Sequence, residues 1–279
     1  MEKRKITKDT QLCISISERP GNFGAIVFNA TFEDLSIDFV YKPLRVSPHN
    51  LASAIAGIRS LGIRGSGVSM PHKTKVLKYL DVVDPVAIDI GAVNTIVNKD
   101  DVLFGYNTDF YGAKKTLEEN YNVLGKKVLV IGAGGASRAI IAALKILKAG
   151  EIHISSRDEL KAKRLAKSLS IDFLPYKHRN NFDGHLLVNA TPVGMTPHTK
   201  DIIVEVNTIS KYEAVMDVVV NPFRTMLIEE AGRLKKIIMP GFQMALHQAC
   251  KQFELYTNIP APFKTMEKCV RNMLDKKII

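Results

Sequence analysis

The chain has 279 residues, of which 46% are hydrophobic and 24% charged, and its formal net charge at pH 7 is +11. This composition is typical of a globular protein with a full hydrophobic core and enough length for two domains. It argues against a membrane-spanning protein, because no uninterrupted apolar run could cross a bilayer, and three cysteines are too few for a disulfide framework.

The positive charge has two interpretations, nucleic-acid binding or attraction of small anions such as phosphates and carboxylates. Lysines and arginines are spread along the chain in short clusters such as residues 161–164, without an aromatic-interleaved basic stripe. Residues 1–5 lack an apolar signal core, and Cys13, Cys250 and Cys269 are too scattered for a zinc knuckle. We therefore expect a cytoplasmic protein with solvated surface charge, a small anionic substrate, no metal, and neither a nucleic-acid nor a membrane partner.

Residues 127–139 combine a β-branched run, a glycine turn and the start of a helical pattern. Gly132 can take a tight turn, and Gly134 lets the backbone approach a pyrophosphate, which the unpaired N–H groups of the next helix would bind. The third position of the glycine pattern is Ser137, so the pattern also fits an ordinary strand-to-helix turn without a ligand. Because strand, turn and helix follow in the required order, we favour a dinucleotide site.

Strand and helix patterns alternate along the chain, which predicts an α/β layer architecture. Before the glycine turn we expect strands at residues 11–17, 39–44, 66–70, 92–97 and 102–106, and helices at 25–35, at 49–61 and after Pro71. From the turn onward we expect strands at residues 127–131, 151–155, 186–190, 214–219 and 235–239, and helices at 139–148, 242–256 and 262–275. The apolar runs of this second half are typical of a parallel sheet covered on both faces.

Polar residues fall at the ends of predicted strands, where open α/β sheets bind ligands. Ser69 ends one strand, and Lys73 would project from the first turn of a helix after Pro71. The helix dipole disfavours a cation there, so a carboxylate or an anionic substrate would compensate. An exposed surface lysine is an equally good interpretation of this feature alone.

Three further polar positions have both a functional and a structural interpretation. Asn94 places an amide on an otherwise apolar strand, and Thr108 or Asp109 could simply cap the helix that follows. Gln248 and Gln252 are four residues apart and share one helix face, where two solvent-exposed glutamines would be unremarkable.

Together these segments resemble the shikimate dehydrogenase family over nearly the whole chain. The resemblance rests on the motifs FNATF (28–32), SMPHK (69–73), AVNT (92–95), NTD (107–109), GAGGA (132–136), NATPVGM (189–195), NP (221–222), QA (248–249) and QF (252–253). The loop at residues 19–24 is similar to that of the divergent shikimate dehydrogenase-like branch.

The resemblance implies a two-domain α/β fold. Residues 1–108, completed by C-terminal helices within residues 242–279, would form the substrate-binding domain, and residues 109–241 a Rossmann-type NADP-binding domain with a parallel sheet. Substrate and nicotinamide would then meet between the domains, which are expected to close on binding.

The implied reaction is the reversible, NADP-dependent transfer of hydride between shikimate, or a shikimate-like cyclic hydroxy acid, and its 3-dehydro ketone, a step of aromatic amino acid biosynthesis. Lys73 and Asp109 would be the catalytic pair: the ammonium stabilises negative charge on the ketone oxygen and supplies the proton, and the carboxylate holds the lysine. Ser69, Asn94 and Gln248 match positions that bind ring hydroxyls in the family.

The resemblance also implies a set of cofactor contacts, at Gly132, Ala133, Gly134, Gly135, Ala136, Ser156, Arg157, Thr191 and Gly241. About 20 residues after the glycine turn, NAD-specific domains present Asp or Glu to the ribose. Here Ser156 and Arg157 occupy that place, and an arginine beside the 2′-phosphate favours NADP. The neighbouring Asp158 blurs this preference, so NAD remains an alternative.

Two departures from the family weaken the inference to shikimate itself. Residues 22–24 (Asn-Phe-Gly) replace a Ser-x-Ser pair that anchors the substrate carboxylate in the main branch, and Val220 replaces a tyrosine. We expect Arg19, Asn22 or the backbone N–H groups of residues 21–24 to bind the carboxylate instead. Arg19 could equally be surface charge.

Three alternatives remain beside this interpretation. One is a dehydrogenase of quinate or another polyol acid that uses NAD, and another is a non-catalytic dinucleotide sensor with the same fold. Retention of Lys73, Asn94 and Asp109 together counts against a sensor, which needs no proton donor. The third is nucleic-acid binding, which predicts DNA affinity with a steep salt dependence.

The sequence is compatible with a monomer or a homodimer.

Overall fold

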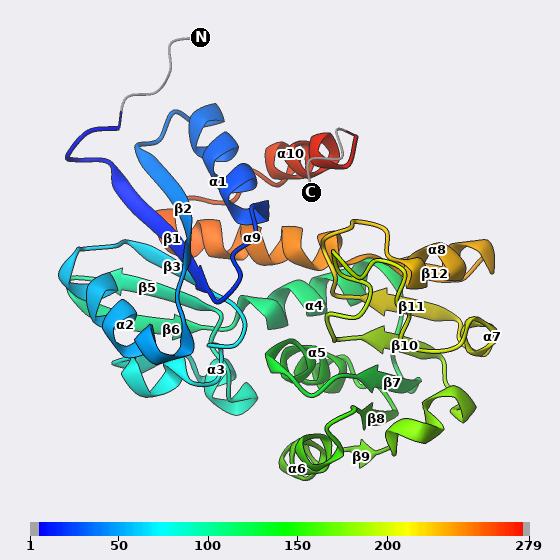
Figure 1. Ribbon diagram of the computed structural model, residues 1–279. Coiled ribbons are helices and arrows are strands. Elements are labelled where there is room, and N and C mark those ends of the chain that lie inside the picture. Colours follow the sequence, from blue (N-terminus) through cyan, green and yellow to red (C-terminus); the bar gives the residue numbers. More distant parts are fainter. Residues whose placement is uncertain (1–5, 276–279) are drawn as a thin grey trace. The chain divides into compact units, whose positions relative to one another are not determined.

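The computed structural model describes residues 6–275, so the segment 1–5 lies outside the described residues. The chain divides into two compact units (Figure 1). The first contains the residues up to Thr108 together with those from Gln248 onward, and the second contains the residues from Asp109 to His247. On the C-terminal side the division falls inside helix α9 (Gly241–Thr257).

The first unit is built on a six-stranded mixed sheet with the strand order β2-β1-β3-β5-β6-β4. Strands β1, β2 and β3 are parallel, whereas β5 runs antiparallel to both β3 and β6. Its strands are β1 (Gln11–Ser17), β2 (Phe39–Arg45), β3 (Gly65–Val68), β4 (Val82–Val83), β5 (Thr95–Lys99) and β6 (Val102–Tyr106). Its other elements are α1 (Phe23–Asp34), η1 (Pro48–Asn50), α2 (Leu51–Ser60), η2 (Val76–Tyr79), α3 (Pro85–Ile90) and α10 (Phe263–Asp275).

Aromatic side chains from three elements, α1, β2 and α9 (Gly241–Thr257), form part of the core of this unit. The ring of Phe28 on α1 stacks on Tyr41 of β2 with centroids 4.6 Å apart, and Phe32 meets Phe253 of α9 at 5.8 Å. The Asn29 side chain donates to the Tyr41 carbonyl oxygen at 2.9 Å and accepts from the Tyr41 amide at 2.8 Å. This pair of hydrogen bonds attaches α1 to β2, which gives the FNATF motif a structural role.

The second unit is a parallel sheet with the order β12-β11-β10-β7-β8-β9. This is the strand order of the doubly wound dinucleotide-binding fold. Its strands are β7 (Lys127–Ile131), β8 (Glu151–Ser155), β9 (Asp172–Phe173), β10 (Leu186–Asn189), β11 (Ala214–Asp217) and β12 (Ile237–Met239). Its helices are α4 (Thr108–Asn120), α5 (Gly135–Ile146), α6 (Glu159–Leu169), η3 (Tyr176–Asn181), α7 (Val206–Ile209) and α8 (Met226–Arg233).

Both faces of the second sheet are buried, as the apolar runs predict. Val128 and Val130 of β7 face a core shared with α4, α5 and α6, whereas Leu129 and Ile131 face the core beneath α7 and α8. Alternate residues of a strand point to opposite faces, so a strand covered on both sides must be apolar throughout.

The expected helix after Pro71 is wrong. Residues 70–75 form successive turns, and only the short 3₁₀ helix η2 follows. The Lys73 carbonyl oxygen accepts a hydrogen bond from the Val93 amide at 2.8 Å, so it does not bond the amide of Leu77 as an α-helix would require. Lys73 therefore lies in a turn, and the helix-dipole argument made for it does not apply.

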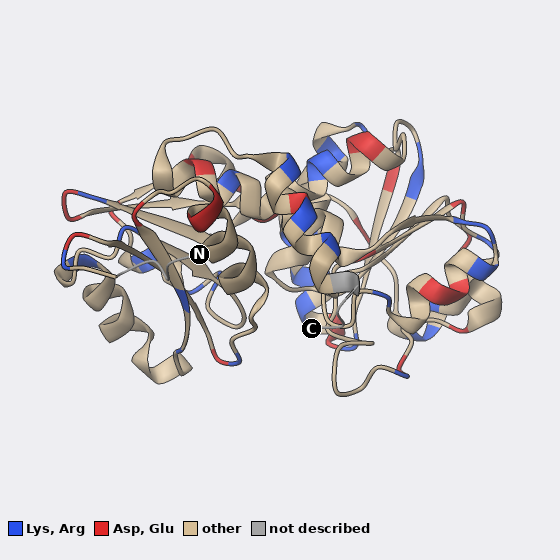
Figure 2. Cartoon of the chain, turned by 90° about the horizontal axis from the view of Figure 1, so that it is seen from above, with Lys and Arg blue, Asp and Glu red and all other residues tan. Residues whose placement is uncertain are grey.

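Basic residues occur on many separate helices and loops (Figure 2). This agrees with the expectation of dispersed surface charge. Within residues 6–275, no helix is both long and apolar enough to cross a membrane.

Candidate active site

A buried polar network lies at the strand ends of the first unit. The Asn94 side chain donates to Thr108 Oγ1 at 3.0 Å, and its Oδ1 accepts from the Thr108 amide at 2.7 Å and from Thr95 Oγ1 at 2.9 Å. Asn94 and Thr95 are fully buried, and Thr108 is 2% exposed. Because each polar group has a partner, the network fixes the backbone where β5 begins and α4 starts.

Gln252 completes this network from α9. Its Nε2 donates to Thr95 Oγ1 at 2.9 Å, and the residue is only 4% exposed. Gln248, the glutamine expected to bind a ring hydroxyl, is partly buried on the same helix. The helical spacing of the two glutamines was the signal for a shared face, but it did not show that Gln252 is buried against Thr95.

The two expected catalytic residues are each connected to this network through the backbone. Lys73 bonds the Val93 amide through its own carbonyl oxygen, one residue before Asn94. Asp109 follows Thr108 directly and is 2% exposed. Lys73 is partly buried, and the division into units places it in the first and Asp109 in the second.

Loops 18–22 and 69–72 of the first unit are hydrogen-bonded to neighbouring backbone, and the last two residues of the expected loop, 23 and 24, already belong to α1. The Glu18 amide donates to the Met70 carbonyl oxygen at 3.1 Å, and the Ser69 amide donates to the Ile16 carbonyl oxygen at 2.9 Å. The expected carboxylate ligands Arg19 and Asn22 are exposed, as is Ser69. Exposed side chains on bonded loops are available to a ligand, so this geometry permits the roles expected of them.

The missing serine at position 24 has a packing explanation. A Cβ atom at Gly24 would lie 3.2 Å from Cε1 and from the hydroxyl of Tyr41, closer than side chains normally pack. Tyr41 is 5% exposed and its ring stacks on Phe28, so it has little freedom to move. A glycine at this position therefore accommodates the tyrosine.

In the second unit the glycine turn connects β7 to α5, at the switch point of the sheet between β7 and β10. Gly132 has φ +124°, and a Cβ there would lie 2.6 Å from the Ala190 carbonyl oxygen. A Cβ atom added at Gly134 would have no neighbouring atom within 4 Å, and the Gly134 amide donates to Ser137 Oγ at 3.2 Å. The helix begins at Gly135, four residues earlier than the periodicity predicts, so its N-terminus adjoins the turn.

The expected adenine-side residues lie at the end of β8. Ser156 is partly buried and Arg157 is exposed. Asp158 accepts a hydrogen bond from the Lys161 amide at 3.0 Å and so caps α6. Its carboxylate has a structural role, which removes the sequence argument that it marks an NAD site.

A buried carboxylate at the end of β11 lies among the remaining expected cofactor residues. Asp217 is 1% exposed and accepts hydrogen bonds from Asn189 Nδ2 and the Val219 amide, each at 3.0 Å, and from Thr225 Oγ1 at 2.6 Å. Burial raises the pKa of Asp217 to about 6, although all three hydrogen bonds favour the charged form. Sequence reasoning did not identify this residue, because an aspartate at a strand end has no distinctive pattern.

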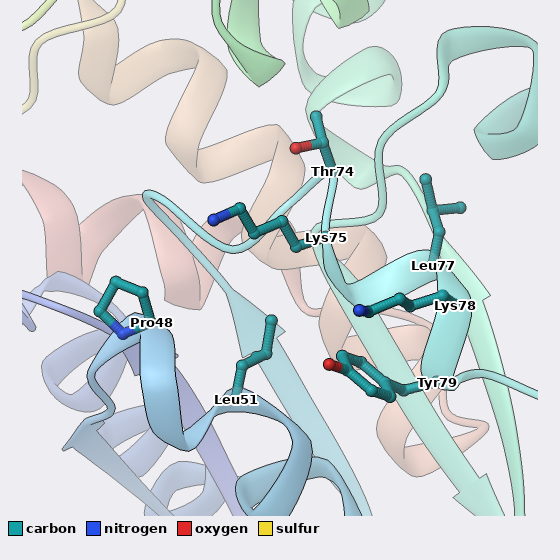
Figure 3. A pocket seen from close by; sticks show the side chains of 7 residues that line it. All are labelled: Pro48, Leu51, Thr74, Lys75, Leu77, Lys78 and Tyr79. Carbon is teal, nitrogen blue, oxygen red and sulfur yellow. The ribbon is translucent and has the colours of Figure 1, made fainter.

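A surface hollow of about 430 Å³ lies beside the turn that carries Lys73 (Figure 3). It is lined by Pro48, Leu51, Thr74, Lys75, Leu77, Lys78 and Tyr79. None of these residues was expected to bind a ligand from the sequence.

A doubly wound parallel sheet with a glycine turn at its switch point, together with an α/β unit with a polar network at its strand ends, is the architecture of two-domain nicotinamide-dependent dehydrogenases. Family models match three parts of the chain: the "shikimate dehydrogenase substrate binding domain" at residues 23–96, "shikimate / quinate 5-dehydrogenase" at 113–220 and the "shikimate 5′-dehydrogenase C-terminal domain" at 241–271. The chain belongs to the shikimate dehydrogenase family.

Known relatives agree with this assignment over almost their full length. The chain is 42% identical to the shikimate dehydrogenase (NADP(+)) of Methanobrevibacter smithii, covering 91% of this chain and 93% of that protein. It is 38% identical to that of Methanothermobacter thermautotrophicus, with coverages of 90% and 92%.

Solved structures of the family have the same fold. A shikimate dehydrogenase in complex with NADP+ is 32% identical, with a TM-score of 0.88 and coverages of 97% and 98%. A shikimate 5-dehydrogenase-like protein is 34% identical, with a TM-score of 0.85 and coverages of 96% and 98%.

The two glycines of the turn are expected to respond differently to substitution by alanine. Gly132→Ala introduces a clash with Ala190 at a positive φ and should lower the free energy of unfolding by about 1–3 kcal/mol. Gly134→Ala, at an extended φ of −96° in open space, should change it by less than about 0.5 kcal/mol. Urea denaturation measures both, and equal stability of the two variants would contradict the role of Gly132.

Asp217 should make stability depend on pH in a defined direction. Its pKa is raised to about 6 in the folded chain from an ordinary value of 3.8, so the folded state retains a proton that the unfolded state has lost. Stability therefore falls as pH rises from about 4 to about 6, by up to about 3 kcal/mol for this group. Denaturation of wild type and Asp217→Asn across this range should give a difference between the two that changes with pH, and a constant difference would refute the assignment.

Proposed function

We propose that this protein is an NADP-dependent oxidoreductase that interconverts shikimate, or a closely similar cyclic hydroxy acid, and its 3-dehydro ketone. The observation that carries the proposal is the buried Asn94 network, which positions the backbone beside Lys73 on one side and beside Asp109 on the other. The family assignment supports the same reaction, since the relatives are named as NADP(+)-dependent shikimate dehydrogenases.

In this proposal Lys73 protonates the substrate oxygen. Reduction of the ketone builds negative charge on that oxygen, and an ammonium within hydrogen-bond reach stabilises the charge and transfers its proton. Asp109 orients the lysine and accepts a hydrogen bond from a ring hydroxyl. In the reverse direction Lys73 accepts the proton from the alcohol, so the same pair serves both directions.

The substrate hydroxyls and carboxylate have separate proposed partners. Ser69 and Gln248 bind ring hydroxyls, and each such contact penalises a substrate that lacks the hydroxyl. Asn94 was expected to do the same, but its side chain is fully buried and bonded to Thr95 and Thr108, so its role is to hold the backbone behind the site. Arg19 and Asn22 on the exposed 18–22 loop bind the carboxylate in place of the absent Ser-x-Ser pair. Arginine suits this task because its guanidinium can form two hydrogen bonds with a carboxylate.

The residues of the second unit fit a dinucleotide. The open space at Gly134 and the N-terminus of the 12-residue helix α5 suit a pyrophosphate. Gly132 and Ala133 complete the turn, and Gly135 and Ala136 begin the helix. Ser156 and Arg157 bind the ribose 2′-phosphate, and Thr191 and Gly241 adjoin the nicotinamide half. When bound, NADPH supplies the hydride that reduces the ketone.

We further propose that the protein acts in the cytoplasm on a small anionic substrate. The three cysteines are free thiols, with Cys13 and Cys250 buried, which is compatible with a reducing compartment.

A spectrophotometric panel of shikimate and quinate, each with NADP and with NAD, tests the function. We expect the highest kcat/KM for shikimate with NADP, and Lys73→Ala should lower kcat by about 10²- to 10⁴-fold while NADPH still binds. Lys75→Ala, which removes an exposed lysine two residues away in the same turn, is the matched control and should leave kcat unchanged. Full turnover by Lys73→Ala, or none by wild type with any pair, would reject the proposal.

The carboxylate role of Arg19 is tested by Arg19→Ala. Loss of a charge-assisted contact should raise KM for shikimate by about tenfold and leave KM for NADP and kcat almost unchanged. Lys42→Ala, an exposed cation on β2, is the control. An unchanged KM for shikimate in Arg19→Ala would assign this arginine to surface charge.

A further inference from the structure

Asp217 occupies a position that the proposed reaction does not use, yet it contacts the loops that the reaction needs. Its Oδ1 accepts from Asn189 Nδ2 at the end of β10 and from the Val219 amide after β11. Its Oδ2 accepts from the hydroxyl of Thr225, the residue that precedes α8. One carboxylate therefore holds three segments together at the C-terminal edge of the parallel sheet.

The first of these segments leads to Thr191 and to the glycine turn. Asn189 Oδ1 accepts from the Thr191 amide at 3.0 Å and from its hydroxyl at 2.6 Å. Asn189 Nδ2 also donates to the Val193 carbonyl oxygen at 3.1 Å, so both N–H groups and the oxygen of this amide are used. A Cβ at Gly132 would lie 3.1 Å from the Thr191 methyl group, so the loop after β10 packs directly on the glycine turn.

The second segment leads to Gly241. A Cβ at Gly241 would collide with the Val219 carbonyl oxygen and would lie 2.7 Å from the carbonyl carbon of Val218. The start of α9 is therefore pressed against the backbone that Asp217 holds through the Val219 amide. Thr191 and Gly241, the two expected cofactor residues on the nicotinamide side, are both one contact away from the Asp217 hydrogen bonds.

The partners of Asp217 are all donors. An amide N–H from β10, a hydroxyl from the start of α8 and a backbone N–H of the loop after β11 face the carboxylate, and its electrostatic partners within residues 6–275 include no charged side chain. A protonated carboxyl must donate one hydrogen bond, and of these three groups only the Thr225 hydroxyl can accept it, by giving up its own donation to Asp217. Protonation therefore removes at least one of the hydrogen bonds that Asp217 accepts.

We propose that Asp217 is a positioning residue for the nicotinamide half of the cofactor, whose ionised carboxylate holds the loops after β10 and β11 in the conformation that binds NADP(H). This rests on the proposed function only in requiring that the cofactor be NADP(H). Burial raises the pKa of the Asp217 carboxyl to about 6, so its change between the protonated and the ionised form lies close to neutral pH.

Binding rather than turnover tests the proposal, by fluorescence titration of the full chain with NADPH. Asp217→Asn should raise the Kd of NADPH about tenfold at about pH 7.5, the size of a lost charge-assisted hydrogen bond. Adenosine 2′,5′-bisphosphate, which carries only the adenine end, should bind both proteins within about twofold, because β8 and its loop have no bond to Asp217. Equal weakening of both ligands would show a merely structural role and overturn the proposal.

The pH profile provides a second readout. The 2′-phosphate of NADPH itself titrates near pH 6, so the Kd of the variant is divided by that of wild type at each pH. This ratio should fall from about ten towards one as the pH drops to about 5, because wild type then carries a protonated Asp217. A ratio that does not change with pH would overturn the proposal.

The matched control is Glu213→Gln on the residue just before β11. Glu213 is an exposed carboxylate at the opposite end of the same strand, paired with Lys126 at 2.9 Å. The Glu213→Gln variant should leave the Kd of NADPH unchanged, because Glu213 lies at the N-terminal edge of the sheet, away from the loops that Asp217 holds. A Kd raised as much as in Asp217→Asn would mean that any carboxylate of this strand has the effect.

If Asp217→Asn does not fold, Thr225→Val replaces it. Loss of the Thr225 hydroxyl removes a donor to the charged form, so the midpoint of the pH dependence of NADPH binding should move to higher pH. Thr225→Ser keeps the hydroxyl and should retain the wild-type midpoint. An unmoved midpoint in Thr225→Val would reject the proposal, whereas a wild type that binds no NADPH would instead reject the proposed function.

Discussion

The first unit depends on one fully buried amide. Asn94 both accepts from and donates to Thr108 and accepts from Thr95, so a residue beside β5 is joined to the start of α4. Leaving such a buried group without partners costs about 1–3 kcal/mol, which makes the arrangement strongly preferred over alternatives. Lys73 and Asp109 are each attached to this network through the backbone. A ligand-binding residue such as Ser69 can therefore lie on an exposed loop while the groups behind it stay fixed.

In the second unit a buried carboxylate, that of Asp217, holds neighbouring backbone segments in place as Asn94 does in the first. An asparagine offers donors and an acceptor together, whereas an ionised aspartate only accepts, so Asp217 collects donors from three segments. The difference has a consequence for regulation. The Asn94 network does not titrate, whereas the Asp217 cluster loses an acceptor when it is protonated. The two halves of the molecule should thus respond differently to acid.

Two residues that qualified the expected substrate and cofactor have local structural causes. Gly24 stands where a serine is expected because the Tyr41 ring occupies the adjacent space. Asp158, which suggested an NAD preference, caps α6 through the Lys161 amide. Neither substitution needs a change of reaction to explain it. Each shows how a residue that looks functional in a motif can be selected by its immediate packing or capping environment.

Sequence patterns alone predicted the alternating α/β elements, the parallel second sheet, the glycine turn and the family, because periodicity and turn chemistry are local properties. They failed after Pro71, where the Lys73 carbonyl bonds Val93 instead of continuing a helix. Gln252 reaches Thr95 across 157 residues, and Asp217 gathers donors from three elements. Only the tertiary structure decided these contacts, because a hydrogen bond between distant segments depends on where the folded strands end and leaves no periodic trace in the chain.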